Sequence, residues 1–273
     1  MRQPVIRTRM WPDAWFEFDG MLDFLCDHPD ITRVCEVGAG ANPVIPPEVI
    51  VARGLSHSIL DISQDELEKA PACYDKIRAD ITQPSLAVGG TFDLVASAFV
   101  AEHVRSPRTF HRNIWNMLRP GGVALHLFPT LYTLPFAFNR TMPTAITERL
   151  LLRQQSFRNP EGRHGKFKAH YRWCRGPTRR QLARLEGMGF AVVAYTGYFG
   201  HGYYLNLGRL HRFEQAKARG LIGRPAMTLT SYALVLLQRP PSTAMALAPV
   251  PARPRSEAVR SSVTQLLHDR GWS

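Results

Sequence analysis

Apolar runs of strand length alternate with helix-like stretches between residues 14 and 128. The strand-like runs are residues 32–37, 56–63, 75–81, 92–99 and 123–128. Apolar positions recur at helical spacing in residues 14–28, and helix starts are indicated by Ser63 with Glu66 and by Ser106 before Pro107. Strands that alternate with helices form parallel units with crossover connections. The pattern therefore predicts a doubly wound α/β sheet.

The alternation of strand-like and helix-like stretches is interrupted at residues 130–176 and then continues. Thr178 with Gln181 indicates another helix start, and residues 190–198 and 227–239 read as the last two strands. We therefore expect an N-terminal helical extension (residues 1–30), a main domain (residues 31–239) that carries an insert (residues 130–176), and a tail (residues 240–273). The tail is rich in Pro and Ala, a composition typical of disordered linkers.

The net charge of +12 is concentrated in two segments. Residues 153–184 hold ten Lys or Arg and one Glu, which gives +9, and residues 239–273 hold five Arg and two acids, which gives +3. The remainder is neutral. The chain has no apolar run of about 18 residues and no secretory leader pattern, and its four cysteines are scattered. These features favour a cytoplasmic protein without a disulfide framework.

The segment VCEVGAGANP (residues 34–43) follows the first strand and contains two glycines. Gly38 and Gly40 would let the backbone approach a ligand closely, and a turn that leads into a helix N-terminus favours anionic or polar ligand atoms. The dinucleotide-binding fingerprint requires a third glycine where this chain has Pro43. A dehydrogenase-type pyrophosphate site is therefore disfavoured.

Acidic residues end the next two strands. Asp61 lies 21 residues after Gly40, where a carboxylate can accept hydrogen bonds from both ribose hydroxyls of an adenosine. Asp80 closes the third strand and could meet the adenine amino group. Asp also ends strands for reasons of turn chemistry alone, and for Asp61 by itself that alternative has equal weight. The succession of Glu36, the glycines, Asp61 and Asp80 at consecutive strand ends favours the binding site.

These motifs occur in a familiar order. CEVGAGANP, LDIS, RADI, FDLVASAFVAEHVRSP and LRPGGVALHLFP together resemble the class I S-adenosylmethionine-dependent methyltransferases of the small-molecule type over about residues 30–130. The resemblance implies a Rossmann-like sheet of seven strands with the last one antiparallel, and S-adenosylmethionine as cofactor. The residues that it implies for the cofactor are Glu36, Gly38, Ala39 and Gly40 at the methionine part, Asp61 and Ile62 at the ribose, Asp80 and Ile81 at the adenine, and Ser97 and Phe99 along the methionine tail.

The acceptor site is less well marked. His103, just past the fourth strand, has a suitable pKa for a general base, although packing at a helix start is the more ordinary role for it. The stretch SAFV stands where DNA base methyltransferases carry a Pro-rich catalytic motif, which disfavours that activity.

The insert has an aromatic front and a basic rear. The front, which includes Tyr132, would form a lid, lie against a membrane surface, or pack on the core. The rear, which includes Arg172, is a solvated surface, a site for an anionic acceptor such as a phosphorylated sugar, or an RNA patch in which Tyr171 and Trp173 stack on bases. His201, among tyrosines and glycines, is a further candidate for the acceptor pocket.

No His or Cys set in the sequence has metal-ligand spacing, so no metal site is predicted. The leading hypothesis is methyl transfer from S-adenosylmethionine to oxygen of a small-molecule or glycan-like acceptor. The alternatives are an RNA methyltransferase that uses the basic insert, and a protein that binds the cofactor without turnover.

Overall fold

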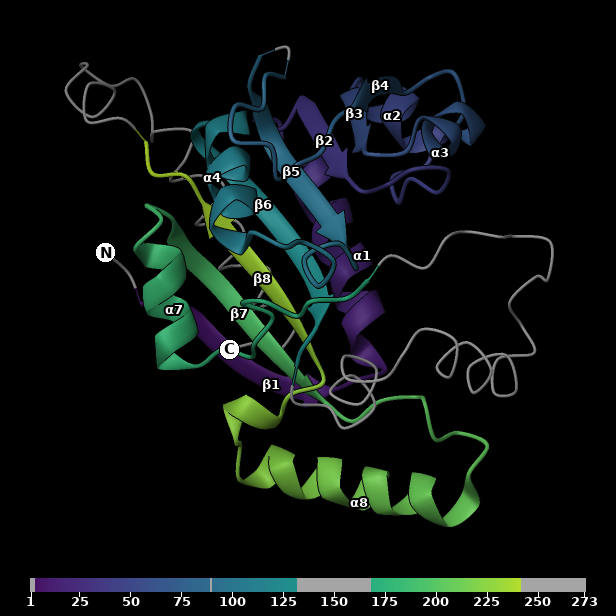
Figure 1. Ribbon diagram of the computed structural model, residues 1–273, viewed down its shortest axis with the longest axis vertical. Helices are drawn as coiled ribbons and strands as arrows, with labels where there is room; N and C mark the ends of the chain where they lie inside the picture. The colour runs from purple at the N-terminus through teal and green to yellow at the C-terminus, as the bar shows by residue number, and fades with distance from the viewer. Residues whose placement is uncertain (1–2, 89, 132–167, 242–273) are drawn as a thin grey trace.

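The chain folds around one mixed β-sheet. The computed structural model describes residues 3–88, 90–131 and 168–241, and its eight strands have the order β1-β7-β8-β6-β5-β2-β3-β4 (Figure 1). The strands are β1 (Val5–Met10), β2 (Arg33–Val37), β3 (Ser56–Asp61), β4 (Asp75–Arg78), β5 (Phe92–Ala98), β6 (Leu118–Pro129), β7 (Ala191–Phe199) and β8 (Tyr232–Gln238). The helices are α1 (Asp13–Cys26), α2 (Pro47–Arg53), α3 (Gln64–Lys69), α4 (Pro107–Met117), α7 (Arg179–Glu186), α8 (Gly208–Gly223) and the short 3₁₀ helix η1 (Met227–Leu229).

The predicted α/β architecture is confirmed, including the antiparallel last strand. β8 lies between β6 and β7 and runs antiparallel to both, whereas β2 to β6 pair with one another in parallel. The eighth strand, β1, was not expected. It pairs in parallel with β7, from Val5 opposite Ala194 to Met10 opposite Phe199. The segment expected to be a helical extension therefore also supplies an edge strand, and then α1.

Helices cover both faces of the sheet. Val34 and Leu94 point to the core that α1, α2 and α3 complete, and the next residues on the same strands, Cys35 and Val95, point to the core beneath α4 and α7. This alternation follows from the two-residue repeat of a strand, and strands covered on both faces read as continuous apolar runs. The insert begins at the end of β6, and residues 132–167 lie outside the described part of the chain.

The predicted helix starts are observed. Ser63 Oγ accepts a hydrogen bond from Glu66 N at 3.3 Å, and Thr178 Oγ1 accepts one from Gln181 N at the same distance. Ser106 Oγ accepts a longer bond from Thr109 N at 3.4 Å, followed by a proline in the first turn. Two helices were missed. These are α2, which starts seven residues after Gly40 instead of directly at the glycine turn, and α8.

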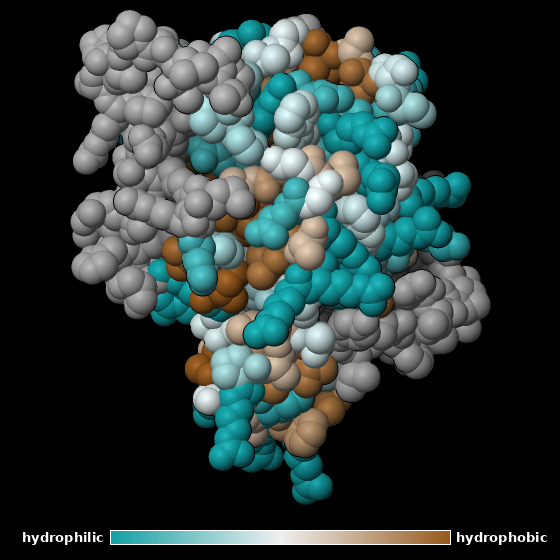
Figure 2. All heavy atoms as spheres, turned by 90° about the vertical axis from the view of Figure 1, so that its left-hand side faces the viewer, coloured by the Kyte–Doolittle hydropathy of each residue, from teal (hydrophilic) through white to brown (hydrophobic). Residues whose placement is uncertain are grey.

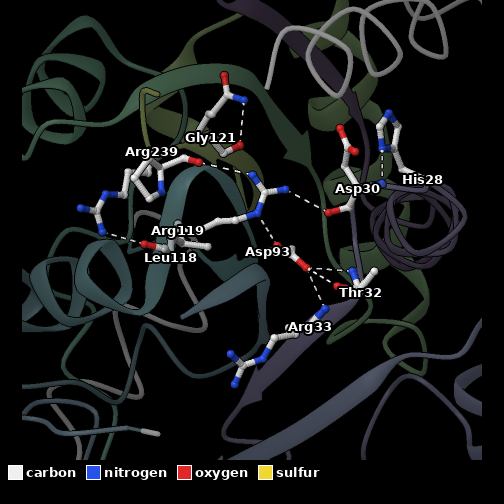
Figure 3. A network of polar contacts seen from close by, with 11 residues as sticks. His28, Asp30, Thr32, Arg33, Asp93, Leu118, Arg119, Gly121 and Arg239 are labelled. Carbon is white, nitrogen blue, oxygen red and sulfur yellow. Dashed lines mark hydrogen bonds and ion pairs between the residues drawn. The ribbon is translucent and has the colours of Figure 1, made fainter. Parts of the chain in front are cut away.

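The amino ends of β5 and β6 are held by a dense polar network (Figure 3). Asp93 Oδ2 accepts hydrogen bonds from the backbone N of Thr32 and of Arg33, each at 2.8 Å, and from Thr32 Oγ1 at 3.0 Å. Its other oxygen accepts a short hydrogen bond from Arg119, whose Nη2 also reaches Asp30 O at 2.9 Å. Arg239 lies nearby and donates to Leu118 O at 2.6 Å. This network joins the loops at the amino ends of the parallel strands, which we call the amino edge. The carboxyl ends of the same strands lie on the opposite side of the sheet, which we call the carboxyl edge.

Across residues 3–88, 90–131 and 168–241, no helix combines the length and apolar character that crossing a bilayer requires.

Candidate functional site

The opposite edge of the sheet gathers most of the predicted cofactor residues. β2, β3, β4 and β5 are parallel, so their carboxyl ends, and the loops that follow them, meet along one line. In open α/β sheets, ligands bind at this edge, where the strand order reverses. Here the reversal lies between β2 and β5, because β3 and β4 extend from one side and β5 and β6 from the other.

Glu36, at the end of β2, turns toward the loop that follows it. Its carboxylate accepts hydrogen bonds from Val44 N at 2.7 Å and Ile45 N at 2.9 Å, and its Oε1 lies 3.1 Å from His57 Nε2. The residue is only 3% exposed. Glu36 was expected to contact the cofactor. In the structure its oxygens are instead directed at protein groups, and it fastens the glycine loop to the end of the sheet.

The glycines of this loop meet their neighbours so closely that side chains would not fit. Gly38 has φ +73°, and a Cβ there would lie 2.3 Å from Val100 Cγ2. Gly40 has φ +49°, and its Cβ would lie 3.1 Å from Glu66 Cβ and 3.2 Å from Asp61 Oδ2. Both the left-handed backbone and the close contacts therefore require glycine. The loop brings backbone against the ends of β3 and β5.

Asp61 stands at the expected place, at the carboxyl end of β3 and beside Gly40. Its Oδ1 accepts a hydrogen bond from Ser63 N at 2.9 Å, which fixes the carboxylate just before α3. Its Oδ2 faces the glycine loop, as the short distance to Gly40 shows. The adjacent Ile62 is 52% exposed, and Ala39 is partly buried against the core. A carboxylate oxygen thus lies beside the glycine turn, in which Gly38 is exposed and Gly40 is buried.

Asp80 follows β4 and organises its own turn. Its Oδ1 accepts from Thr82 N and from Thr82 Oγ1, both at 2.7 Å. Asn113, on α4, donates to Ile81 O at 2.7 Å and to Gln83 O at 2.8 Å. Ile81, expected beside the adenine ring, is 6% exposed and packs into the core under α4. Asn113 was missed, because an Asn in a helix pattern gives no sign that it supports a distant loop.

Ser97 lies near the end of β5, and Phe99 directly follows the strand. The Ser97 Oγ lies 2.8 Å from His126 Nδ1, and both side chains are buried, so only the backbone of Ser97 can line the edge. Phe99 has φ +58°, which is unusual for a bulky residue and occurs mainly where function requires it. Its ring stacks on Trp15, with centroids 5.0 Å apart, and meets Tyr232 edge to face at 6.1 Å. These three rings form an aromatic wall beside the glycine loop.

Comparisons with known proteins agree with this geometry. Residues 36–126, from the end of β2 to the middle of β6, match the family model of a methyltransferase domain. A solved S-adenosylmethionine-dependent methyltransferase from Mesorhizobium loti superposes with a TM-score of 0.51 at 18% identity, over 83% of this chain and 97% of that one. Residues 36–126 therefore match a methyltransferase domain, and the fold of the chain is that of solved S-adenosylmethionine-dependent methyltransferases.

Two further structures show how far the likeness extends. A putative methyltransferase from Bacillus halodurans has a TM-score of 0.50 at 12% identity, over 82% of this chain and 99% of that one. Phosphoethanolamine N-methyltransferase 2 from Haemonchus contortus, solved with S-adenosyl-L-methionine, has a TM-score of 0.49 at 15% identity, and the match covers 83% of this chain but only 53% of the nematode protein. None of the curated protein sequences compared with this chain matches it.

In the methyltransferase domain, His103 lies on the loop after β5. Its backbone N donates to Val100 O at 2.9 Å, and 35% of its side chain is exposed. His103 Nε2 lies 3.7 Å from Glu102 Oε1. Glu102 itself is 4% exposed, and burial raises the pKa of its carboxyl to about 8. Glu102 can therefore hold a proton at neutral pH beside an imidazole, an arrangement suited to proton transfer.

The predicted acceptor residues of the methyltransferase domain do not come together in the described structure. Tyr132 lies outside the described residues. Arg172 is exposed, and its Nη1 donates to Arg105 O at 3.0 Å. His201 is only 1% exposed, and its Nε2 lies 3.6 Å from Glu214 Oε1 beneath α8. Burial lowers the pKa of His201 to about 4. His201 thus makes an interior contact with Glu214, and its place in the acceptor pocket stays a prediction.

Proposed function

We propose that this methyltransferase domain binds S-adenosylmethionine along the carboxyl edge of β2, β3, β4 and β5 and transfers its methyl group to a small-molecule acceptor. The observation that carries the proposal is the juxtaposition of the left-handed turn at Gly40 and Asp61 Oδ2, which sets a glycine turn and a carboxylate side by side at the carboxyl ends of β2 and β3. The family match over residues 36–126 supports the same site.

The chain's own groups have separable tasks. Asp61 accepts hydrogen bonds from the two ribose hydroxyls, Asp80 and the turn that Asn113 supports receive the base, and Phe99 with the glycine loop shapes the cleft for the amino acid part. The bound sulfonium supplies an electrophilic methyl group. The protein's main contribution is then to orient the acceptor behind that carbon and to keep water out, because positioning supplies much of such a rate enhancement.

We propose oxygen of a small or glycan-like molecule as the acceptor atom, with His103 as the base. A hydroxyl must lose its proton as the new bond forms, and His103 is partly exposed on the loop after β5, beside the protonatable Glu102. The exposed Arg172, next to the backbone of Arg105, supports an anionic group on that acceptor.

The RNA alternative receives less support. Tyr171 is 3% exposed, and Trp173 stacks on His111 with centroids 5.9 Å apart, beneath the guanidinium of Arg184. Rings that are packed in this way offer no stacking platform for bases. A steep salt dependence of RNA binding that is lost on neutralising Lys168 and Arg172 would nevertheless favour RNA as the acceptor.

Calorimetry with S-adenosylmethionine tests the cofactor site. We expect saturable binding by the wild-type protein and about 10- to 100-fold weaker binding by Asp61→Ala, since hydrogen bonds to a charged group contribute about 1.5–3 kcal/mol. Asp65→Ala is the matched control, because Asp65 is exposed on α3 and its loss removes the same charge. Absence of saturable binding, or an Asp61→Ala variant that binds as tightly as the wild type, would contradict the proposal.

Transfer of a labelled methyl group tests the acceptor. The full chain is incubated with a small-molecule extract and with RNA separately, and the labelled product is identified by mass spectrometry. We expect an oxygen-methylated small molecule, formed more slowly by His103→Ala, with a loss that shrinks at low pH, where the wild-type imidazole is protonated and cannot act as a base. A methylated amine would refute oxygen as the acceptor, labelled RNA would establish the alternative, and binding without any transfer would indicate a protein without turnover.

A further inference from the structure

The segment from Leu205 to Phe213 places apolar side chains on the surface. Phe213 is 66% exposed, Leu205 57%, Leu207 43% and Leu210 42%. Arg209 and Arg212 are exposed between them. We call these six residues the α8 surface. Single exposed apolar residues are ordinary, but a cluster interleaved with cations on one short segment indicates an interaction site.

One side of α8 is fixed to the rest of the molecule. Glu214 and Ala218 are its buried residues. Glu214 Oε2 accepts from Lys217 Nζ at 2.6 Å, and its Oε1 lies near His201, while Ala218 packs close to Gly200. The helix is therefore held by a polar contact and a small residue, and its large apolar side chains face outward. In a helix that only covered a core, the large apolar side chains would face inward.

The charge around this surface has one sign. Residues 203–224 contain five basic residues, namely Arg209, Arg212, Lys217, Arg219 and Arg224. The one acid in this stretch, Glu214, is buried and bonded to Lys217. The outer side of α8 thus combines apolar and cationic groups without a carboxylate. A helix of this composition lies in the interface of an anionic bilayer, with arginines at the headgroups and Phe and Leu among the acyl chains.

The position of α8 relates this surface to the active edge. β6 and β7 are both antiparallel to β8, so β7 runs in the same direction as β6 and the other parallel strands. The loop from β7 to α8 therefore starts at the carboxyl edge of the sheet, as the glycine loop does. In Figure 1, α8 lies below the ends of β1 and β7. Figure 2 shows hydrophobic and hydrophilic side chains next to each other at this lower end.

We propose that the α8 surface docks on an anionic lipid bilayer. Apolar contact would come from Leu205, Leu207, Leu210 and Phe213 and electrostatic attraction from the arginines. Docking would bring the active edge of the methyltransferase domain to the membrane surface. The inference concerns binding to lipid and does not depend on which acceptor is methylated.

Vesicle sedimentation of the full chain tests the proposal. We expect binding to vesicles of phosphatidylcholine with phosphatidylglycerol, weaker binding to phosphatidylcholine alone, and a loss of affinity as salt rises. The double variant Leu210→Ser, Phe213→Ser should bind the anionic vesicles at least tenfold more weakly, since it removes two apolar anchors. Val51→Ser is the apolar control, because Val51 is 79% exposed on α2.

A matched pair of charge variants separates α8 from basic residues elsewhere on the protein. Arg209→Gln with Arg212→Gln should weaken binding, whereas Arg179→Gln with Arg180→Gln, both exposed on α7, should leave it unchanged. Circular dichroism and binding of S-adenosylmethionine by each variant show that the fold is intact. No binding to anionic vesicles, or binding that the α8 variants leave unchanged, would overturn the proposal. So would a dimer in sedimentation velocity that Phe213→Ser abolishes, if vesicles do not bind, because the occupant would then be a second copy.

Discussion

The amino and carboxyl edges of the sheet both contain buried polar side chains, but these differ in how many hydrogen-bond partners they have. At the amino edge, both oxygens of the buried Asp93 are occupied, by Thr32, Arg33 and Arg119. At the carboxyl edge, the buried Glu102 Oε2 and His126 Nε2 have no hydrogen-bond partner among the described residues. Unsatisfied buried groups are costly and concentrate where a protein does chemistry. Buried polar atoms without a partner also occur near the amino edge, at Arg53 Nη1 and Trp115 Nε1. The two edges therefore differ in their buried carboxylates, because both oxygens of Asp93 are paired and Glu102 Oε2 is not.

Backbone conformation shows the same contrast. Phe99, at the carboxyl edge, adopts a left-handed conformation, and so do Gly38 and Gly40. For Phe99 this conformation is strained and persists only where surrounding structure imposes it, whereas glycine adopts it without a steric cost. The amino-edge network, drawn in Figure 3, joins three segments through Arg119.

Removal of the Asp93 carboxylate should have the largest effect. Asp93→Ala leaves Arg119 without its anionic partner and two backbone N–H groups of Thr32 and Arg33 without an acceptor. We expect the free energy of unfolding to fall by about 3–5 kcal/mol, the usual cost of breaking a buried pair. Urea denaturation followed by circular dichroism measures it. An effect below about 1 kcal/mol would show that the amino edge is not the stabilising one.

The same carboxylate gives a pH dependence of known sign. Burial raises the pKa of Asp93, but hydrogen bonds from Arg119, Thr32 and Arg33 outweigh it, and the net pKa is lowered. A carboxyl whose folded pKa is below its unfolded value of about 3.9 stabilises the protein above that pH and loses this contribution as pH falls through the folded pKa. The stability difference between wild type and Asp93→Ala should therefore shrink below about pH 4.

At the carboxyl edge, Gly38→Ala should act on binding. The new Cβ would meet Val100 Cγ2 at 2.3 Å in a left-handed conformation that itself costs about 1–2 kcal/mol. We expect affinity for S-adenosylmethionine to fall at least about 30-fold, which corresponds to about 2 kcal/mol. Gly54→Ala provides the control: Gly54 has φ +62° but nothing within 4 Å of its Cβ, so it isolates the backbone term. Equal affinities for the two variants would exclude the contact with Val100 as the cause.

The sequence was informative where a motif coincides with a strand end. Asp61 and the glycines could be placed because a turn, a carboxylate and a parallel strand each leave a local signal. The helix caps at Ser63 and Thr178 were predictable for the same reason. These are properties of a few neighbouring residues, and they survive in any fold that contains them.

Other features depend on residues far apart in the chain. β1 reads as six residues of mixed character, VIRTRM, and becomes a strand only because β7 offers it an edge. In α8, Glu214 is buried against His201, a contact that the pattern of apolar residues along the chain cannot predict. The role of Glu36 in fastening its own loop likewise appears only when residues 44 and 45 fold back onto it.

The unsatisfied Glu102 should give the carboxyl edge a stability profile opposite to that of Asp93. Burial raises the pKa of Glu102 to about 8, so its stabilising contribution is fully present below about pH 4.5 and is lost as pH rises through about 8. We expect the free energy of unfolding of the wild type to fall, relative to Glu102→Gln, by about 1–2 kcal/mol between pH 7 and pH 9. Glu186→Gln, at an exposed position on α7, serves as the control and should show no such trend. Parallel pH profiles for wild type and Glu102→Gln would mean that Glu102 is ionised throughout.

The smallest effect should come from an ion pair at the amino edge that is open to solvent. Arg53 Nε lies 2.7 Å from Asp27 Oδ1, a distance typical of a strong bond, but 59% of the Asp27 side chain is exposed. Water already stabilises both charges there, so Asp27→Asn should change the free energy of unfolding by less than about 1 kcal/mol. The same urea titration could show a loss as large as that of Asp93→Ala. In that case, location at the amino edge and not burial would determine how much each aspartate contributes to the free energy of unfolding. A small loss would instead trace the difference between the two aspartates to desolvation and to the number of donors around each.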